Sequence, residues 1–220
     1  MTMPESQLIL PCRNEEQALR VLLPRVPEGV GVVVVDNGSS DATAAVAMAH
    51  GATVVSEPRP GYGAAVQAGL EAATARYVAV MDGDGSFDPA DAVELLARVR
   101  RGETDLAVGR RCPARRKLIP WHARLGNALV LRRLRRHSGV ELRDLGAMRA
   151  ARRDALLALG VADRRFGYPV ELLDRAGRAQ WRIREIDVAY HPRTVGTRSK
   201  VSGSLLGSAR AALDFWRVVP

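Results

Sequence analysis

The chain has 220 residues, and its hydrophobic content of 47% is sufficient for one sizeable domain or at most two small ones. Its two cysteines show no disulfide or metal-binding spacing, and no stretch approaches the roughly 18 apolar residues of a membrane span. The formal net charge of +9 is uneven: residues 1–100 carry seven basic and 13 acidic side chains, whereas residues 101–220 carry 26 and 11. We therefore expect a metal and a nucleotide in the first half and a phosphate-bearing partner in the second.

Composition also bears on partners and location. Aromatic residues make up 5% of the chain, and no helix-turn-helix, zinc or single-strand-binding motif is present, so the basic half does not predict binding to nucleic acid. The N-terminal segment has neither the basic region nor the long apolar run of a signal peptide. Together with the cysteine usage, this predicts a cytoplasmic protein.

The first hundred residues alternate between predicted strands and predicted helices. Strands are expected over residues 7–11, 31–35, 52–57 and 77–81. Helices are expected over residues 13–23, 42–50, 64–73 and 89–100. Asn14 is the expected N-terminal cap of the first helix, and Asp88 that of the last. This alternation predicts an α/β fold with a mostly parallel, doubly wound sheet.

Polar and glycine-rich turns follow the predicted strands of this first half. They contain the side chains Pro11, Asn14, Glu15, Asp36, Gly61, Gly63, Asp82 and Asp84. Ligands of doubly wound sheets bind outside the carboxyl ends of the strands, so these residues are expected to meet at one site. The chain has no G-x-G-x-x-G after its first strand and no G-x-x-x-x-G-K-[ST], which argues against a nicotinamide dinucleotide and against a P-loop enzyme.

Asp82 and Asp84 are the strongest candidates for chemistry. In an extended segment their side chains point the same way, and the intervening Gly83 leaves room for a ligand to approach. Two hard oxygen ligands of this kind suit Mg²⁺ or Mn²⁺. The alternative is an acidic turn without a metal, since Asp-Gly pairs are common in turns.

Together, these motifs resemble family 2 glycosyltransferases with the GT-A fold, a three-layer sandwich around a mostly parallel sheet. The first-half matches are Pro11-x-Arg13-Asn14-Glu15, Val35-Asp36-Asn37-Gly38-Ser39-x-Asp41-x-Thr43, Gly61-x-Gly63-x-Ala65 and Asp82-Gly83-Asp84. Later matches are residues 105–111 and 143–150. Residues 166–171 and 196–200 resemble the dolichol-phosphate mannosyltransferase-like branch.

The resemblance implies one GT-A domain over residues 1–220 that transfers a sugar, with inversion, from a UDP- or GDP-linked donor in a metal-dependent reaction. Residues 1–100 would bind nucleotide and metal, residues 101–203 would bind the acceptor, and residues 204–220 would form an amphipathic helix. The base and ribose pocket would contain Pro11, Asn14, Glu15, Asp36, Gly61 and Gly63. The metal would be bound by Asp82 and Asp84. The remaining catalytic candidates are Arg111, Arg124, Glu171, Arg198 and Lys200.

Several alternatives remain open at this stage. Glu171 is equally well explained as a helix partner of Arg175, four residues on. Asn37 replaces a carboxylate that the family usually carries, which leaves the nucleobase open. His191 is interpreted as structural or solvated, and residues 191–200 have the composition of a mobile lid.

The acceptor is expected to be a polyprenyl phosphate, because an ionised phosphate needs no strong general base. One rival is a soluble phosphorylated acceptor, and another is a non-enzymatic basic protein that binds nucleic acid or a membrane surface. The apolar stripe expected over residues 204–219 would lie on the inner face of the membrane as a peripheral contact. Alternatively, it would pack on the domain or on a second subunit to form a homodimer.

Overall fold

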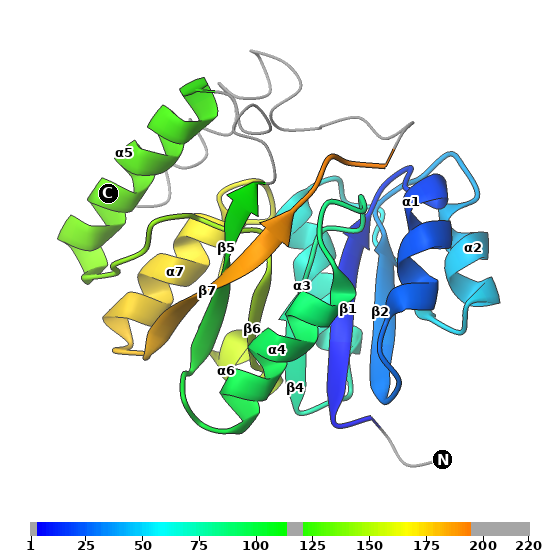
Figure 1. Cartoon of the computed structure of the whole chain (residues 1–220), viewed down its shortest axis with the longest axis horizontal. Helices are drawn as coiled ribbons and strands as arrows, with labels where there is room; N and C mark the ends of the chain where they lie inside the picture. The colour runs from blue at the N-terminus through cyan, green and yellow to red at the C-terminus, as the bar shows by residue number, and fades with distance from the viewer. Residues whose placement is uncertain (1–3, 114–120, 195–220) are drawn as a thin grey trace.

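The computed structural model describes residues 4–113 and 121–194 and contains a seven-stranded sheet with the strand order β3-β2-β1-β4-β6-β5-β7 (Figure 1). The strands are β1 (Ser6–Cys12), β2 (Val30–Asp36), β3 (Thr53–Ser56), β4 (Tyr77–Val80), β5 (Leu106–Pro113), β6 (Arg149–Arg152) and β7 (Ile183–Tyr190). Strand β6 is antiparallel to its neighbours β4 and β5, and the other pairs are parallel. The prediction of a mostly parallel α/β sheet is therefore confirmed.

Helices cover both faces of this sheet. They are α1 (Glu16–Leu22), the short 3-10 helix η1 (Leu23–Arg25), α2 (Thr43–Ala49), α3 (Tyr62–Ala72), α4 (Pro89–Arg100), α5 (Trp121–Ser138), α6 (Arg153–Ala158) and α7 (Tyr168–Arg178). Helices α1, α2 and α4 pack on one face, and α3, α5, α6 and α7 pack on the other (Figure 1). This is the three-layer arrangement expected from the sequence. Among the described helices, none has the length and apolarity needed to cross a bilayer.

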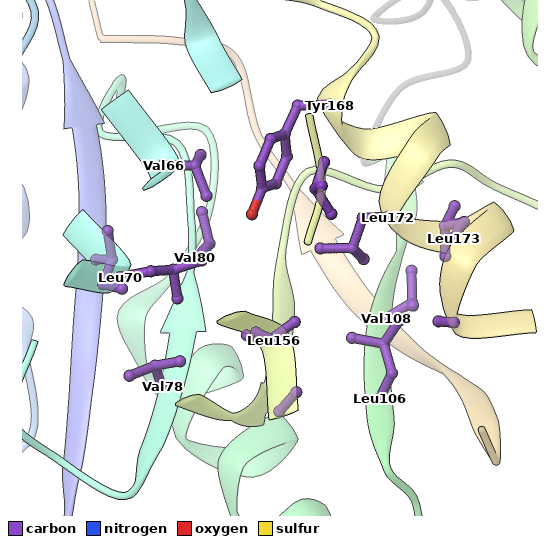
Figure 2. Packing of buried hydrophobic residues seen from close by; sticks show 14 of the residues in the cluster. Val66, Leu70, Val78, Val80, Leu106, Val108, Leu156, Tyr168, Leu172 and Leu173 are labelled. Atoms are coloured by element: carbon purple, nitrogen blue, oxygen red, sulfur yellow. The ribbon is translucent and has the colours of Figure 1, made fainter. Parts of the chain in front are cut away.

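The sheet separates two hydrophobic cores, which explains why its central strands are apolar at nearly every position. In β1, Ile9 faces the α3 side, whereas Leu8 and Leu10 face the α1 side. Figure 2 shows part of the α3-side core, formed by side chains from α3, β4, β5, α6 and α7: Val66, Leu70, Val78, Val80, Leu106, Val108, Leu156, Tyr168, Leu172 and Leu173. Because strands β1, β2 and β4 are fixed from both sides, the loops at their carboxyl ends start from rigid positions.

The predicted element bounds are close to the observed ones, with one instructive error. Asn14 is not the cap of the first helix: α1 begins at Glu16, and the cap residue Glu15 makes no capping hydrogen bond with its own side chain. Asn14 instead adopts a left-handed conformation with φ 57°, which asparagine tolerates better than most residues. Asp88 does cap α4, because its side chain accepts a hydrogen bond from the Ala90 amide at 3.0 Å.

Candidate functional site

The carboxyl ends of β1 and β2 are tied together through the turn that follows β2. The Asn14 amide donates to Ser39 Oγ at 2.9 Å, and Asn14 Oδ1 accepts from the Ser40 amide at 2.8 Å. Asp36 Oδ1 accepts from the Ser39 amide at 2.9 Å. The Glu15 amide, in a buried residue, donates to the Thr43 hydroxyl at 2.9 Å. The predicted nucleotide residues Asn14, Glu15 and Asp36 therefore meet at one edge of the sheet, and half-buried Pro11 lies at the same end of β1.

Asn37 organises the next loop, a role that the sequence did not reveal. Its side-chain amide nitrogen donates to Glu57 O at 2.9 Å and to Arg59 O at 2.7 Å, and its Oδ1 accepts from the Gly61 amide at 3.0 Å. A carboxylate has no hydrogen to donate, so aspartate could not make the first two bonds. These contacts explain why an amide stands at a position where the family usually carries an acid.

Gly61 and Gly63 lie at the start of α3, where the chain passes close to residues 163–165. A Cβ atom on Gly61 would stand 2.2 Å from Arg164 O, and one on Gly63 would stand 2.5 Å from Asp163 O. Gly61 also has φ 148°, which side chains rarely adopt. Both glycines are thus required by this backbone contact, while their role in binding a nucleotide stays a prediction.

The two central carboxylates follow β4 directly. Asp84 is 4% exposed, its Oδ1 accepts from the Ser86 amide at 3.0 Å, and its Oδ2 forms an ion pair with Arg193 Nε at 2.9 Å. Asp82 is half-buried. Burial and the neighbouring Asp84 raise the pKa of Asp82 to about 6, although the nearby charges of Arg193, Arg149 and Arg111 oppose the rise.

This donor set fits a divalent cation. Asp82 and Asp84 are held together at the end of a rigid strand, the charge of Asp84 raises the pKa of Asp82, and a cation would relieve the repulsion. Within the described residues, no group of three or more His, Cys, Asp or Glu side chains is arranged to hold a metal ion. Asp82 and Asp84 would therefore provide the protein ligands, and water and a diphosphate would complete the coordination, as is usual for Mg²⁺.

Three arginines surround the carboxylates, and the sequence had singled out one of them. Arg111 donates from Nε and Nη2 to Asp144 at 2.8 and 2.6 Å, and its guanidinium lies 5.7 Å from the centre of the Tyr190 ring. Arg149 is 6% exposed, pairs with Val80 of β4 across the sheet, and donates to Leu145 O. It lies within the segment 143–150 that carries the family resemblance, so a signal for it was present.

Arg193 was also missed, although the loop that contains it was recognised. The end of β7 brings this loop onto the acidic turn: the His191 amide donates to Ser86 O at 3.0 Å, and the Thr194 amide donates to Asp84 O at 3.1 Å. Gly85 has φ 78°, and a Cβ atom on it would meet the Thr194 hydroxyl at 2.3 Å, so the close approach of the two loops requires glycine. The structure thus couples residues 191–194 to the candidate metal ligands.

Two tyrosines, half-buried Tyr62 and buried Tyr168, adjoin Arg149. Burial and the charge of Asp82 raise the pKa of Tyr62, which hydrogen-bonds to Arg149. Tyr168, labelled in Figure 2, is 3% exposed, and among the described residues its hydroxyl has no hydrogen-bond partner. The pKa of both phenols is therefore raised, so both stay neutral at pH 7, and Tyr62 also lies within reach of the charge of Asp82.

The other predicted site residues are Arg124 and residues outside the described part of the chain. Arg124 is exposed on α5, and its predicted role stays a prediction. Arg198 and Lys200, most of the predicted lid and the predicted helix over 204–219 lie outside the described residues.

Glu171 holds a loop in place. It is 8% exposed, its two oxygens accept from the Ala162 and Asp163 amides at 2.9 and 2.7 Å, and Oε1 also accepts from Arg175 Nε at 2.6 Å. The sequence had offered an ion pair with Arg175, four residues on, as the alternative to a catalytic role for Glu171. That ion pair is present. Since residues 163–165 contact Gly61 and Gly63, Glu171 positions the loop that packs on the start of α3.

We expect Glu171→Gln to lower the free energy of unfolding by about 1–3 kcal/mol, because one partly buried loop amide loses its acceptor. Denaturant unfolding measures this loss. Glu94→Gln is the matched control, since the exposed i,i+4 pair of Glu94 with Arg98 contributes little. A variant that unfolds like the wild type but has lost catalytic turnover would instead return Glu171 to a catalytic role.

Comparison with known proteins identifies the family of the chain. The family model described as "Glycosyl transferase family 2" matches residues 7–160. An uncharacterised glycosyltransferase of Mycobacterium tuberculosis is 54% identical over 212 residues, covering 96% of each chain. The polyprenol monophosphomannose synthase of Mycolicibacterium smegmatis is 29% identical over 240 residues, covering 96% of this chain and 86% of the relative.

Among solved structures, glucosyl-3-phosphoglycerate synthase from Mycobacterium tuberculosis, in complex with phosphoglyceric acid, superposes with a TM-score of 0.75 at 23% identity. The match covers 98% of this chain and 80% of that one. A complex of the same enzyme with Mn²⁺, UDP-glucose and glycerol 3-phosphate matches with a TM-score of 0.66 at 25% identity, over 87% and 74% of the two chains. The fold is therefore that of these GT-A enzymes. Because the family model matches more than half of its length, the chain belongs to glycosyl transferase family 2 and is a glycosyltransferase.

Proposed function

We propose that this enzyme transfers a hexosyl group, with inversion, from a UDP- or GDP-linked sugar to a phosphate-bearing acceptor, using Mg²⁺ or Mn²⁺. The observation that carries the proposal is the pair Asp82 and Asp84 at the carboxyl edge of the sheet, with the charges of Arg111, Arg149 and Arg193 acting on it. The two carboxylates suit a metal cation, and the nearby arginines suit the negatively charged diphosphate that the metal accompanies.

The metal would be held by Asp82 and Asp84. When bound, it would supply positive charge to the diphosphate that leaves the sugar. Arg193 and Arg111 would engage phosphate oxygens, since a guanidinium can donate two parallel hydrogen bonds to one phosphate. Asp144 already fixes the guanidinium of Arg111, so little reorganisation is needed when the donor arrives.

Other parts of the chain take the roles that the sequence predicted. Pro11, Asn14, Glu15 and Asp36 would line the base and ribose pocket, beside Gly61 and Gly63. Residues 1–100 would form the donor half of one domain, and residues 101–203 its acceptor half, in which Arg124, Arg198 and Lys200 would bind phosphate. The segment 204–220 would contact the inner face of the membrane or a second subunit, in a cytoplasmic enzyme.

The acceptor we favour is a polyprenyl phosphate. An ionised phosphate oxygen attacks without a strong general base, and the charges of Arg111, Arg149 and Arg193 that act on Asp82 suit a phosphate acceptor. The similarity to a polyprenol monophosphomannose synthase over 96% of this chain supports it. The second candidate is a soluble phosphorylated acceptor, supported by the solved relative that binds glycerol 3-phosphate.

A panel of UDP- and GDP-sugars tested by thermal unfolding with Mn²⁺ would identify the donor. At 100 times its dissociation constant, a bound donor stabilises the folded state by about 2.7 kcal/mol, which corresponds to a rise of about 5–10 °C in Tm for a chain of this size. EDTA should remove the rise. If no nucleotide sugar raises Tm in the presence of metal, the proposal fails.

Radiolabelled transfer to undecaprenyl phosphate and to glycerol 3-phosphate, assayed side by side with the donor so identified, would then separate the two acceptors. We expect the prenyl phosphate to be used at least tenfold more efficiently. Equal or better use of the soluble acceptor would contradict the polyprenyl assignment and leave the donor assignment intact.

A further inference from the structure

A cleft of about 700 Å³ lies between α5, the loop that follows it and the edge strand β7. Its lining does not include the candidate donor-site residues, although the loop after α5 contributes Arg143 to the cleft and Asp144 to the support of Arg111. Its apolar lining comes from Leu131, Val140, Leu142 and Ile183. Its charged lining comes from Arg110, Arg132, Arg135, Arg143, Arg184, Glu141, Glu185 and Asp187.

The three acidic side chains of the cleft are already engaged. Asp187 accepts both hydrogen bonds of Arg110, at 2.5 and 2.6 Å, and Glu141 pairs with Arg135 at 2.9 Å. Glu185 accepts the backbone amides of Arg143 and Asp144 at 2.7 and 2.8 Å, which ties the loop to β7. These carboxylates therefore hold the walls of the cleft together, and the five arginines of its lining outnumber them.

Three arginines remain. Arg132 on α5, Arg143 on the loop and Arg184 on β7 are exposed, and among the described residues no ion pair or side-chain hydrogen bond engages them. They come from three separate elements that converge on one cleft. Like charges brought together in this way repel, and a bound anion would relieve the repulsion.

We propose that this cleft is a second anion site, which binds a phosphate group attached to an organic moiety. A phosphate offers oxygens to several guanidinium groups at once, and the apolar lining suits the group that carries it. The site is separate from the donor site because side chains of successive strand residues point to opposite faces. Arg110 turns to Asp187 in the cleft, whereas the next residue, Arg111, turns to Asp144 and Tyr190.

The phosphate could come from a soluble ester or from a lipid headgroup, and α5 offers a way to tell them apart. Leu125 and Leu129, 54% and 51% exposed, lie on the helix N-terminal to Arg132. If the phosphate belongs to a lipid headgroup, these exposed leucines should insert into the lipid surface and contribute to binding. A soluble phosphate would need the arginines alone.

The test compares two double variants of the full chain that remove equal charge. The cleft variant is Arg132→Gln with Arg143→Gln. The control is Arg136→Gln with Arg178→Gln, on the exposed surfaces of α5 and α7 and outside the cleft lining. Calorimetric titration with glycerol 3-phosphate in EDTA probes the soluble source, and sedimentation with phosphatidylglycerol vesicles probes the lipid source.

We expect the wild type to bind one of the two probes, the cleft variant to bind it at least tenfold more weakly, and the control to change less than twofold. Should vesicles be the ligand, Leu125→Ser with Leu129→Ser should also weaken sedimentation, while titration with the soluble phosphate would be unaffected by that change. Binding of neither probe, or equal losses in the cleft and control variants, would overturn the proposal.

Discussion

Asp84→Asn should reduce sugar transfer by at least about 1,000-fold while leaving the protein folded. The asparagine oxygen can still accept the hydrogen bond from the Ser86 amide, so the turn keeps its shape. What is lost is a negative charge in a buried position, where it would help to hold the cation on the leaving diphosphate. The loss should therefore fall on the catalytic step and on metal binding together.

Two measurements separate this from a structural effect. Calorimetric titration with Mn²⁺ in the presence of UDP should show at least tenfold weaker metal binding in the variant, independently of turnover. Asp154→Asn, on α6 and paired with Arg152 at the surface, is the control and should match the wild type in both assays. Metal-dependent turnover near the wild-type rate in Asp84→Asn would remove the metal assignment.

The strands of the sheet were predictable because a strand that is buried on both faces has apolar residues at nearly every position. Val33, Val34 and Val35 are fully buried, and a run of β-branched residues of this kind is typical of a strand covered on both sides. The acidic pair that follows β4 was predictable for the same reason, since the strand before it was clear. Strand β6 was not predicted, because the four residues Arg149–Arg152 carry no period-two pattern.

Much of the site could not be predicted because its contacts join residues that lie far apart in sequence. Arg193 reaches Asp84 only because the parallel pairing of β5 and β7 carries the end of β7 to the same edge of the sheet. Asn37 bridges to Gly61 through a loop whose path the sequence does not specify. Sequence motifs identify residues whose side chains are suited to catalysis or binding. The topology of the sheet determines which of these residues lie close together.

The Arg111–Asp144 ion pair, at the carboxyl edge of the sheet, also contributes to the stability of the fold. Asp144 is 7% exposed, and it accepts hydrogen bonds from the backbone amide, Nε and Nη2 of Arg111. Burial raises the pKa of Asp144, but the hydrogen bonds and charge of Arg111 outweigh burial, so the pKa lies below its ordinary value of 3.8. Folding therefore favours the ionised carboxylate.

Asp144→Asn should lower the free energy of unfolding by about 3 kcal/mol at pH 7, because it leaves the guanidinium of Arg111 largely buried without its counter-charge. The neighbouring residue provides the matched control. Asp187→Asn removes the same kind of bidentate partner from Arg110, but the side chain of Asp187 is 58% exposed whereas that of Asp144 is 10% exposed, so the stability should be nearly unchanged. Similar losses in the two variants would show that burial does not set the strength of the Arg111 pair.

The same variant has a distinctive dependence on pH. A carboxyl group whose pKa is lowered by folding contributes its stability above the ordinary pKa and loses it as the pH falls toward the folded-state pKa. The stability difference between wild type and Asp144→Asn should therefore be constant from pH 7 to about 5 and should shrink below the ordinary value of 3.8. Urea unfolding at pH 7, 5, 4 and 3 measures the difference directly. If the stability difference stays constant down to pH 3, the destabilisation comes from the loss of hydrogen-bond geometry and not from the loss of the charge of Asp144.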